Sequence, residues 1–381
     1  MPSSTCSTAS ALSVRTSSST TLVADRQIPM GLIVRLRQSP ALAGLWLVFL
    51  LAACSRPADR TQLTFHGQSM GTTWTVHAVY AAAVAPAIRA DVERQINSRL
   101  RELDRRYSTW KPNSELNRLN RAPVGKRFRV SRDFAKLLKV ADRVWQRSEG
   151  YFDPTVFPLV DAWGFGPSRR TTAPTAAELT ALRHRAGWRF IRLRGQDVLR
   201  TTDVTLDLSA IAKGWAVDAV AADLDKLQAL GYMVEVGGEV RLHGRKPDGT
   251  LWRIGIEQPD PAGRSISRVL ELSDISLATS GDYRNYRVVN GQRLSHTIDP
   301  HSGHPVTHST ASVTVLLPDC GEADAWATAL LAAGSKRGLA IANNWRIPAL
   351  FIDHDGQGFR TTENRWFTDQ LNRYTEDEEV P

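Results

Sequence analysis

The segment Leu206-Asp207-Leu208-Ser209-Ala210-Ile211-Ala212-Lys213-Gly214 joins a short apolar run, interpreted as a strand, to an amphipathic helix. The helix is expected over about 214–230, because apolar residues recur there at helical spacing, with Gly231 as its stop. A strand-to-helix turn leaves backbone N–H groups without partners, which makes the start of the helix a ready anion site. Lys213 adds a positive charge beside these groups. The segment therefore predicts strands packed on helices with a phosphate site at one junction, although lysines also occur at helix starts that bind no ligand.

Helix and strand patterns continue on both sides of this segment. Three more helices are expected, over 91–105, from a Ser131 cap to Gly150, and over about 322–333 up to Gly334. Short β-rich runs predict strands at 234–236, 252–257, 312–317 and 349–352. Strands occur in neighbouring groups rather than in strict β-α-β alternation. This order favours an α+β fold, a single domain with a largely antiparallel sheet and flanking helices.

The bulk composition is that of an ordinary globular chain of 381 residues, 42% hydrophobic and 23% charged. We place one domain at 63–370 and an acidic tail at 371–381, since no repeat or long linker interrupts the part between them. The net charge of +9 is spread along the chain without a Lys/Arg run, which argues against a nucleic-acid partner. The three cysteines, Cys6, Cys54 and Cys320, exclude a disulfide scaffold and a zinc site built from cysteines.

The N-terminal region is typical of an exported protein. Two arginines precede the uncharged stretch 41–53, which is too short to span a bilayer but suits the apolar core of a secretory signal. The stretch runs into Leu51-Ala52-Ala53-Cys54, which resembles the bacterial lipobox, where the cysteine is acylated and becomes the mature N-terminus. We therefore expect an N-terminal extension and lipoprotein signal peptide at 1–53, lipid on Cys54 and a tether at 54–62. The chain would then lie on the periplasmic side of a bacterial membrane, with the inner membrane favoured. A plain signal peptide or a buried helix is the alternative, and Met30 is a second possible start.

Seven further segments with polar residues are candidates for the chemistry. They lie at 69–73, 107–116, 151–167, 236–241, 279–283, 295–305 and 323–331. No Gly-x-Gly-x-x-Gly, Walker-type loop or serine-hydrolase elbow occurs in the chain, so the usual dinucleotide, NTP and serine-hydrolase interpretations have no support. Each segment also has a plain structural interpretation as a turn, a bulge or a core edge.

Three of these segments carry residue types that suit ligand binding or catalysis. Asp153 precedes a proline and is held away from helical geometry, so its carboxylate can accept hydrogen bonds from a heterocycle or within an Asx turn. His296 is a candidate general base, because histidine titrates near neutral pH, although a single histidine is more often structural. Asp324 and Thr328 are four residues apart and share a helix face. Their oxygens suit Mg²⁺, unless Thr328 bonds back to the main chain.

Taken together and in order, the eight segments resemble the FAD:protein FMN transferases, the ApbE family. The resemblance covers roughly residues 64–355 and includes Met-Gly-Thr, Asp-Leu-Ser-Ala-Ile-Ala-Lys-Gly, His-Thr-Ile-Asp-Pro and Ala-Asp-Ala-Trp-Ala-Thr-Ala. It implies that FAD, the flavin donor, is contacted by Met70, Trp110, Tyr151, Phe152, Asp153, Asp207, Lys213, His296 and Ile298, with Trp110 stacking. It also implies a Mg²⁺ site made by the Ala210 backbone oxygen, Asp324 and Thr328.

The resemblance implies the reaction as well. FMN would pass from FAD to a threonine or serine hydroxyl of a target protein with release of AMP, and Mg²⁺ would serve as a Lewis acid. His296 would act as the base, with Asp282 and Asp299 as rivals. The acceptor would carry a Ser/Thr-Gly-Ala-Thr-like stretch within a membrane redox complex. The same residues would also serve a lipoprotein that binds FAD without catalysis, or a Mg²⁺-dependent FAD diphosphatase.

Overall fold

The computed structural model describes residues 59–260, 263, 265–282, 286–289, 292–356 and 358–376. The chain divides into two compact units, Met1–Ser55 and Arg56–Pro381, and the described residues all belong to the second unit. The expected signal peptide, the lipidation site Cys54 and most of the tether lie outside the described residues. Among the residues that are described, no helix combines the length and the apolar character needed to cross a membrane.

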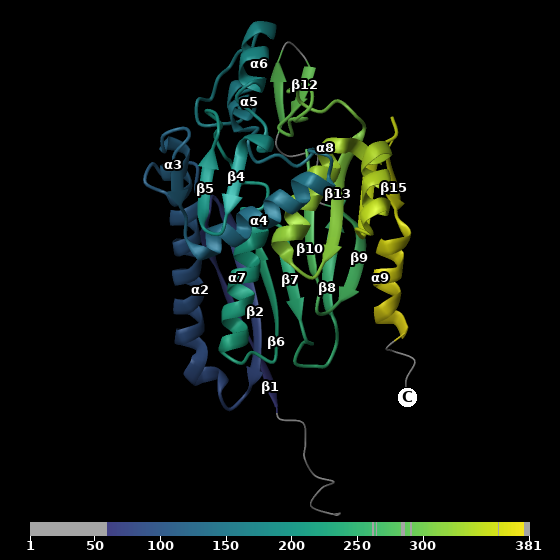
Figure 1. Ribbon diagram of the computed structural model, residues 1–381. Helices are drawn as coiled ribbons and strands as arrows, with labels where there is room; N and C mark the ends of the chain where they lie inside the picture. The colour runs from purple at the N-terminus through teal and green to yellow at the C-terminus, as the bar shows by residue number, and fades with distance from the viewer. Residues whose placement is uncertain are drawn as a thin grey trace, which may run out of the picture. The chain divides into compact units, whose positions relative to one another are not determined.

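An eight-stranded sheet forms the centre of the second unit (Figure 1). Its strands lie side by side in the order β1 (Arg60–Ser69), β2 (Thr72–Ala81), β6 (Gly231–Val236), β7 (Glu239–His243), β10 (Ser276–Gly281), β13 (Thr310–Leu317), β14 (Ala349–His354) and β15 (Phe359–Glu363). Every neighbouring pair in this order is antiparallel. The predicted α+β fold with a largely antiparallel sheet is therefore confirmed.

The remaining strands form three small antiparallel sheets. They are β3 (Arg127–Arg129), β4 (Ile191–Arg194) and β5 (Asp197–Arg200), the pair β8 (Trp252–Glu257) and β9 (Ile266–Leu272), and the pair β11 (Tyr286–Val289) and β12 (Gln292–Ser295). The helices are α2 (Ala85–Tyr107), α3 (Glu115–Arg121), α4 (Arg132–Arg147), α5 (Phe157–Ala162), α6 (Ala176–Arg183), α7 (Ala212–Lys226), α8 (Cys320–Trp345) and α9 (Arg365–Glu376), with a 3₁₀ turn at Trp188–Phe190.

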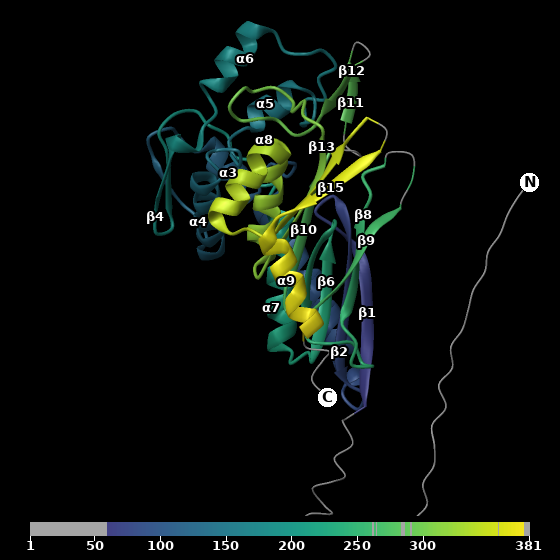
Figure 2. The same ribbon diagram turned by 90° about the vertical axis from the view of Figure 1, so that its right-hand side faces the viewer.

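The two faces of the large sheet are covered by different elements. Helices α7 and α8 pack against one face and contribute Val217, Val220 and Trp326 to the main core. Strands β8 and β9 and helix α9 contribute to a second core over the other face, and Figure 2 shows β8 and β9 on the side opposite α7 and α8. Because β13 is covered on both faces, it is buried from Thr310 to Leu316. Each fully buried aliphatic side chain contributes roughly 1.5–3 kcal/mol to stability.

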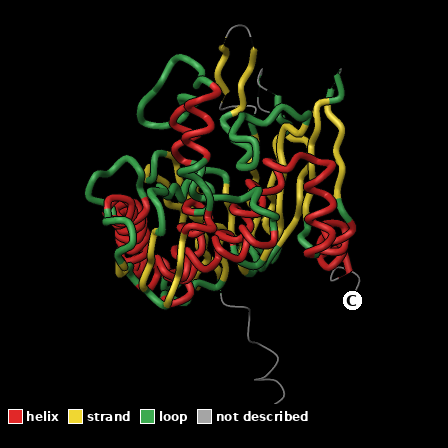
Figure 3. The backbone as a smooth tube through the Cα atoms, turned by 45° about the horizontal axis from the view of Figure 1, so that its top comes forward, coloured by secondary structure: helices red, strands yellow, loops and turns green. Residues whose placement is uncertain are grey.

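A smaller lobe stands at one end of the sheet. Residues of α5, α6 and the segment after β12 form a third apolar cluster that includes Trp163, Leu179 and Ile298. The Trp163 indole also donates to the Gly303 carbonyl oxygen at 2.9 Å. Figure 3 shows loops gathered at this end, between α6 and the β11–β12 hairpin. This end of the sheet is where most of the polar segments meet.

Several boundaries differ from those expected. β1 begins at Arg60, inside the expected tether, and α9 continues to Glu376, inside the expected tail. Helix α7 ends at Lys226, and Gly231 starts β6 instead of stopping the helix. Gly334 does leave helical geometry, with φ 70° and ψ 165°, but α8 resumes and runs on to Trp345. No strand precedes α7 within residues 201–211, where Leu206 is held instead by the Asn120 side chain.

Candidate functional site

The first turns of α7 and α8 lie against each other and bring a lysine and an aspartate together. The Gly214 amide, one of the α7 N–H groups that lacks a partner within the helix, donates to Asp324 Oδ2 at 3.0 Å. Lys213 Nζ lies 3.6 Å from Asp324 Oδ1, and Asp324 is only 2% exposed. A Cβ atom on Gly214 would lie 2.3 Å from the Cys320 carbonyl oxygen, so this approach of the two helices requires glycine.

A second buried carboxylate, Glu239 at the start of β7, contacts the same lysine. Its Oε1 lies 2.8 Å from Lys213 Nζ, and its buried Oε2 has no hydrogen-bond partner among the described residues. Burial raises the pKa of Glu239 to about 8, although the Lys213 charge opposes this shift. Burial alone would lower the pKa of Lys213, but Asp324 and Glu239 outweigh it and raise that pKa. The ammonium therefore stays charged at the start of α7.

Two turns close around this lysine. Gly237 and Gly238, between β6 and β7, have φ of +64° and +103°, which side chains rarely adopt. A Cβ atom on Gly237 would lie 2.9 Å from Thr72 and 3.1 Å from the Lys213 side chain, and its amide donates to the Thr73 carbonyl oxygen at 3.0 Å. The side chains of Lys213, Asp324 and Glu239 are called the Lys213 group below. The β1–β2 turn, which carries Met70, therefore borders the Lys213 group.

The predicted metal ligands have donor atoms that suit Mg²⁺. Thr328 lies one helical turn beyond Asp324, and its hydroxyl is 3.0 Å from the Ser280 hydroxyl on β10. Ala210 lies two residues before α7. Within the described residues, no group of three or more His, Cys, Asp or Glu side chains is arranged to hold a metal. An ion held by Asp324 and Thr328 would thus need oxygens from the main chain, water and substrate, which is how Mg²⁺ usually binds.

Two further aspartates tie their segments into turns. Asp153 and Asp207 each accept hydrogen bonds at 2.5–2.8 Å from the amide and the hydroxyl two residues further along the chain. Burial raises the pKa of both carboxyls more than these hydrogen bonds lower it. The Asp207 amide donates to the Pro154 carbonyl oxygen at 2.7 Å, so the two segments adjoin. The Asx-turn geometry expected as the plain interpretation of Asp153 is present, and it uses Asp153 Oδ1.

Hydrogen bonds from α3 hold the loop that carries Trp110, while the Trp110 indole is exposed to solvent. The Asn117 amide group donates to the carbonyl oxygens of Thr109 and Lys111 at 2.8 and 2.9 Å. Trp110 itself is 63% exposed. By contrast, Phe152 is 2% exposed, and its ring packs within the main core.

The segment after β12 reaches the remaining predicted residues. His296 is partly buried, with its ring 6.3 Å from that of Phe165, while Ile298 is buried in the third cluster. Burial alone would raise the pKa of Asp299, but hydrogen bonds from His301 and Ser302 lower it to about 2.

His301 connects this segment to the end of α4. Its Nε2 lies 2.9 Å from the Glu149 carbonyl oxygen, and its ring is 4.5 Å from that of Tyr151. The Asp299 hydrogen bond raises the pKa of His301. Tyr151 thus lies where the 295–305 segment meets the segment that begins at residue 151.

A cavity of about 780 Å³ opens beside this contact. Its walls are Trp145, Gln146, Glu149, Gly150, Asp153, Val156, Thr180, Arg183, His184, Ala186, Gly187, Arg189, Pro300 and His301. Asp153 is the one predicted site residue among them, and the Lys213 group lies outside the lining. We therefore base the site on the Lys213 contacts rather than on this cavity.

The structure thus brings the predicted residues together in two groups. Lys213, Asp324, Thr328 and the Met70 turn surround the start of α7, whereas Tyr151 and Asp153 lie near the 295–305 segment. Asp207 joins the two groups through its bond to Pro154. Sequence reasoning missed Glu239, although it directly follows the glycine pair in a segment that was already a candidate.

Comparison with known proteins identifies the same family as the sequence resemblance. The family model described as ApbE family matches residues 70–351. The FAD:protein FMN transferase of Vibrio cholerae is 40% identical over 322 residues, covering 83% of this chain and 95% of that protein. The FAD:protein FMN transferase of Haemophilus influenzae is 37% identical over 325 residues, covering 83% of this chain and 93% of that protein.

Solved structures agree with these relatives. The apo flavinyl transferase ApbE of Pseudomonas stutzeri superposes with a TM-score of 0.76 at 35% identity, covering 83% of this chain and 98% of that one. The Vibrio cholerae flavin transferase ApbE gives a TM-score of 0.75 at 38% identity, covering 82% of this chain and 99% of that one. The chain therefore belongs to the ApbE family, and with it to the FAD:protein FMN transferases.

Proposed function

We propose that this chain transfers FMN from FAD to the hydroxyl of a serine or threonine in an acceptor protein, with Mg²⁺ bound and AMP released. The observation that carries the proposal is the contact of Lys213 with Asp324 and Glu239 at the start of α7. A helix N-terminus with a fixed ammonium favours a diphosphate, and a buried carboxylate beside it favours a divalent cation. A dinucleotide with bound Mg²⁺ supplies both the negative diphosphate and the divalent cation.

Each residue of the group would have a distinct task. Lys213, oriented by Glu239 at 2.8 Å, would neutralise oxygens of the FAD diphosphate at the positive end of the α7 dipole. Asp324, Thr328 and the Ala210 carbonyl oxygen would hold Mg²⁺, which supplies Lewis acidity and charge neutralisation when bound. Trp110, exposed on its anchored loop, would stack on a ring of FAD.

The transfer itself exchanges one phosphorus–oxygen bond for another. The acceptor hydroxyl oxygen attacks the phosphorus of the FMN half, the bond to the AMP phosphate breaks, and AMP leaves with the bonding electrons. The hydroxyl proton passes to a base, for which we propose His296. Asp299 is a weaker rival, because hydrogen bonds from His301 and Ser302 outweigh burial and lower its pKa to about 2. Asp282 remains the second rival.

The place of the reaction is proposed from the N-terminal sequence. Lipid on Cys54 would fix the enzyme to the periplasmic side of a bacterial membrane, with the inner membrane favoured. The acceptor would be a subunit of a membrane redox complex with a Ser/Thr-Gly-Ala-Thr-like stretch. Enzyme and acceptor would then share one membrane surface.

Replacement of Asp324 tests this function. Asp324→Ala should abolish Mg²⁺-dependent release of AMP from FAD in the presence of an acceptor, because the only side-chain carboxylate proposed to hold the metal is lost. AMP is measured by chromatography over a Mg²⁺ titration. Asp353→Asn is the matched control, since Asp353 is also buried but contacts Thr310 on β13.

The outcomes separate the alternatives. Full activity of the Asp324→Ala protein would remove the metal assignment. Bound FAD without AMP release by the wild type would indicate a flavin-binding lipoprotein, and AMP release without flavin on the acceptor would indicate a diphosphatase.

A further inference from the structure

Helix α8, which carries Asp324 and Thr328, is capped by a residue of another helix. Its own N-cap residue, Asp319, makes no capping hydrogen bond with its side chain. Instead the amides of Cys320 and Gly321 donate to Oδ1 and Oδ2 of Asp218, at 3.0 and 2.9 Å. Asp218 lies in the second turn of α7. One carboxylate of α7 thus binds two of the four amides that a helix start leaves free.

The capping is reciprocal. The N-cap residue of α7, Ile211, also makes no side-chain capping bond, and the Gly214 amide donates to Asp324 of α8. The two helix starts touch at glycines, since a Cβ atom on Gly321 would lie 3.1 Å from the Trp215 ring. Each helix therefore holds the start of the other, and the proposed metal ligand Asp324 is one half of this arrangement.

Strand β7 supports both halves. Arg241 Nη1 donates to Asp218 Oδ1 at 2.6 Å, and Glu239, two residues earlier on the same strand, contacts Lys213. Residues two apart on a strand point to the same face. Arg241 also lies 3.9 Å from Asp319. Two side chains of β7 therefore fix both contacts between the helices: Arg241 positions Asp218 beside the α8 amides, and Glu239 positions Lys213 beside Asp324.

We infer that Asp218 is a positioning residue for the proposed metal and diphosphate site, acting through α8 rather than by touching a ligand. This inference rests on the proposed function. Asp324 and Thr328 lie about one and two turns beyond the amides that Asp218 binds. If the first turn of α8 moves, both oxygens move relative to Lys213. Changes in residues that orient metal ligands typically cost about 10–100-fold in metal affinity or activity.

The test measures the binding of Mg²⁺ to FAD-saturated full-length protein by calorimetry. Asp218→Asn removes the charge, and it turns an NH₂ group toward the α8 amides in place of one acceptor oxygen. We expect the Mg²⁺ Kd to rise at least about tenfold. AMP release at saturating Mg²⁺ should recover most of its wild-type rate, because the ligands themselves remain.

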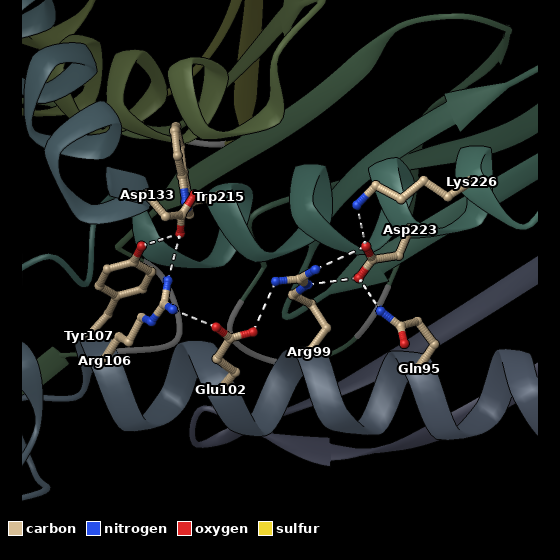
Figure 4. A network of polar contacts seen from close by, with 9 residues as sticks. All are labelled: Gln95, Arg99, Glu102, Arg106, Tyr107, Asp133, Trp215, Asp223 and Lys226. Carbon is tan, nitrogen blue, oxygen red and sulfur yellow. Dashed lines mark hydrogen bonds and ion pairs between the residues drawn. The ribbon is translucent and has the colours of Figure 1, made fainter. Parts of the chain in front are cut away.

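Asp223→Asn is the matched control. Asp223 is a buried aspartate on the same helix, but it accepts hydrogen bonds from Arg99 and Gln95 of α2 and from Lys226 (Figure 4). Its loss should lower the melting temperature at least as much as Asp218→Asn does. The Mg²⁺ Kd should stay at the wild-type value, because none of these contacts reaches α8.

A second variant covers the case in which Asp218→Asn fails to fold. Arg241→Gln leaves the capping carboxylate in place and removes its ion pair, so we expect a rise of about threefold in the Mg²⁺ Kd. Wild-type Kd values in both variants, or an equal rise in Asp223→Asn, would overturn the inference and leave the proposed function intact. A wild type that binds no Mg²⁺ would overturn the proposed metal site and the inference together.

Discussion

Lys213 carries its charge between the buried carboxyl groups of Asp324 and Glu239, and this explains how a cation is kept at the start of a helix beside a proposed Mg²⁺ site. Asp324 and Glu239 raise the pKa of Lys213 against the effect of burial. Glu239 is held differently, since burial raises its pKa to about 8 and one of its oxygens has no partner among the described residues. The group is therefore sensitive to pH before any ligand binds.

The metal-free protein should lose stability as the pH rises toward about 8, in part because of Glu239. The pKa of this group lies above its ordinary value of 4.5 in the folded state, so folding favours the protonated form. Its contribution to stability is complete below 4.5 and is lost as the pH rises through about 8. Glu239→Gln should flatten this part of the dependence of melting temperature on pH.

The control for this titration is Glu271→Gln. Glu271 is an exposed carboxylate paired with Arg253 on the neighbouring strand. It should keep the wild-type dependence on pH. An unchanged slope in Glu239→Gln would show that the titrating group lies elsewhere.

At the scale of residues, the sequence predicted those site residues that lie in distinctive local motifs. Lys213, Asp324 and Thr328 were predicted from their segments. Lys213 lies 3.6 Å from Asp324, and Thr328 follows Asp324 by one turn of α8. Glu239 and Asp218 were not predicted, because each acts on a residue far away in the chain. Asp218 binds amides more than 100 residues later, and no local pattern encodes such a contact.

At the scale of elements, the α3 region fixes the loop that presents Trp110. Asn117 binds two carbonyl oxygens of that loop, and Asn120 exchanges hydrogen bonds of 2.9 Å in both directions with the main chain of Leu206. The loop is therefore attached to the segment that leads into α7. An exposed indole gains most from such support, because less conformational freedom is lost when a ligand stacks on it.

Asn117→Ala should weaken FAD binding by about three- to tenfold, since the lost hydrogen bonds are each worth roughly 0.5–1.5 kcal/mol. Fluorescence quenching of FAD measures the Kd. Asn97→Ala is a suitable control, because the Asn97 side chain bonds within α2. Equal FAD affinity of the Asn117→Ala protein and the wild type would show that the fixed loop around Trp110 does not contribute to FAD binding.

Elements were predicted well where local signals agree and less well where tertiary contacts decide. Ser131 does cap α4, and its hydroxyl accepts from the Phe134 amide. Gly334 was expected to end α8, yet it only interrupts the helix. A Cβ atom there would lie 2.6 Å from the His308 ring, so the glycine allows a close contact within a longer helix.

At the scale of the whole folded unit, the β1–β2 hairpin links the entry of the chain to the site. β1 begins at Arg60, six residues after Cys54, and the turn at Met70 borders the Lys213 group. A ten-residue strand spans roughly 33 Å. β1 therefore carries the chain over roughly this length, from Arg60 to the turn that borders the Lys213 group.

Lipid attachment is testable in cells. Cys54 should take up labelled fatty acid, and Cys54→Ala should leave the protein unlabelled and released from membranes, because Cys54 is the one residue proposed to carry the lipid anchor. Cys6→Ala serves as the control and should keep the label. A wild-type chain that stays unlabelled would rule out the lipobox.

The α+β fold and the family were available from the sequence at this scale, because the order of eight segments is more informative than any one of them. The division of the site into two groups was not available. It depends on contacts such as that between Asp207 and Pro154, which join segments more than 50 residues apart.

The most direct measurement is the intact mass of a candidate redox subunit after incubation with this protein, FAD and Mg²⁺. We predict that the subunit gains the mass of one FMN less one water, that AMP appears in equal amount, and that both changes vanish when Mg²⁺ is chelated. A subunit of unchanged mass, in a reaction where a relative of known transferase activity does modify it, would contradict the transfer that we propose.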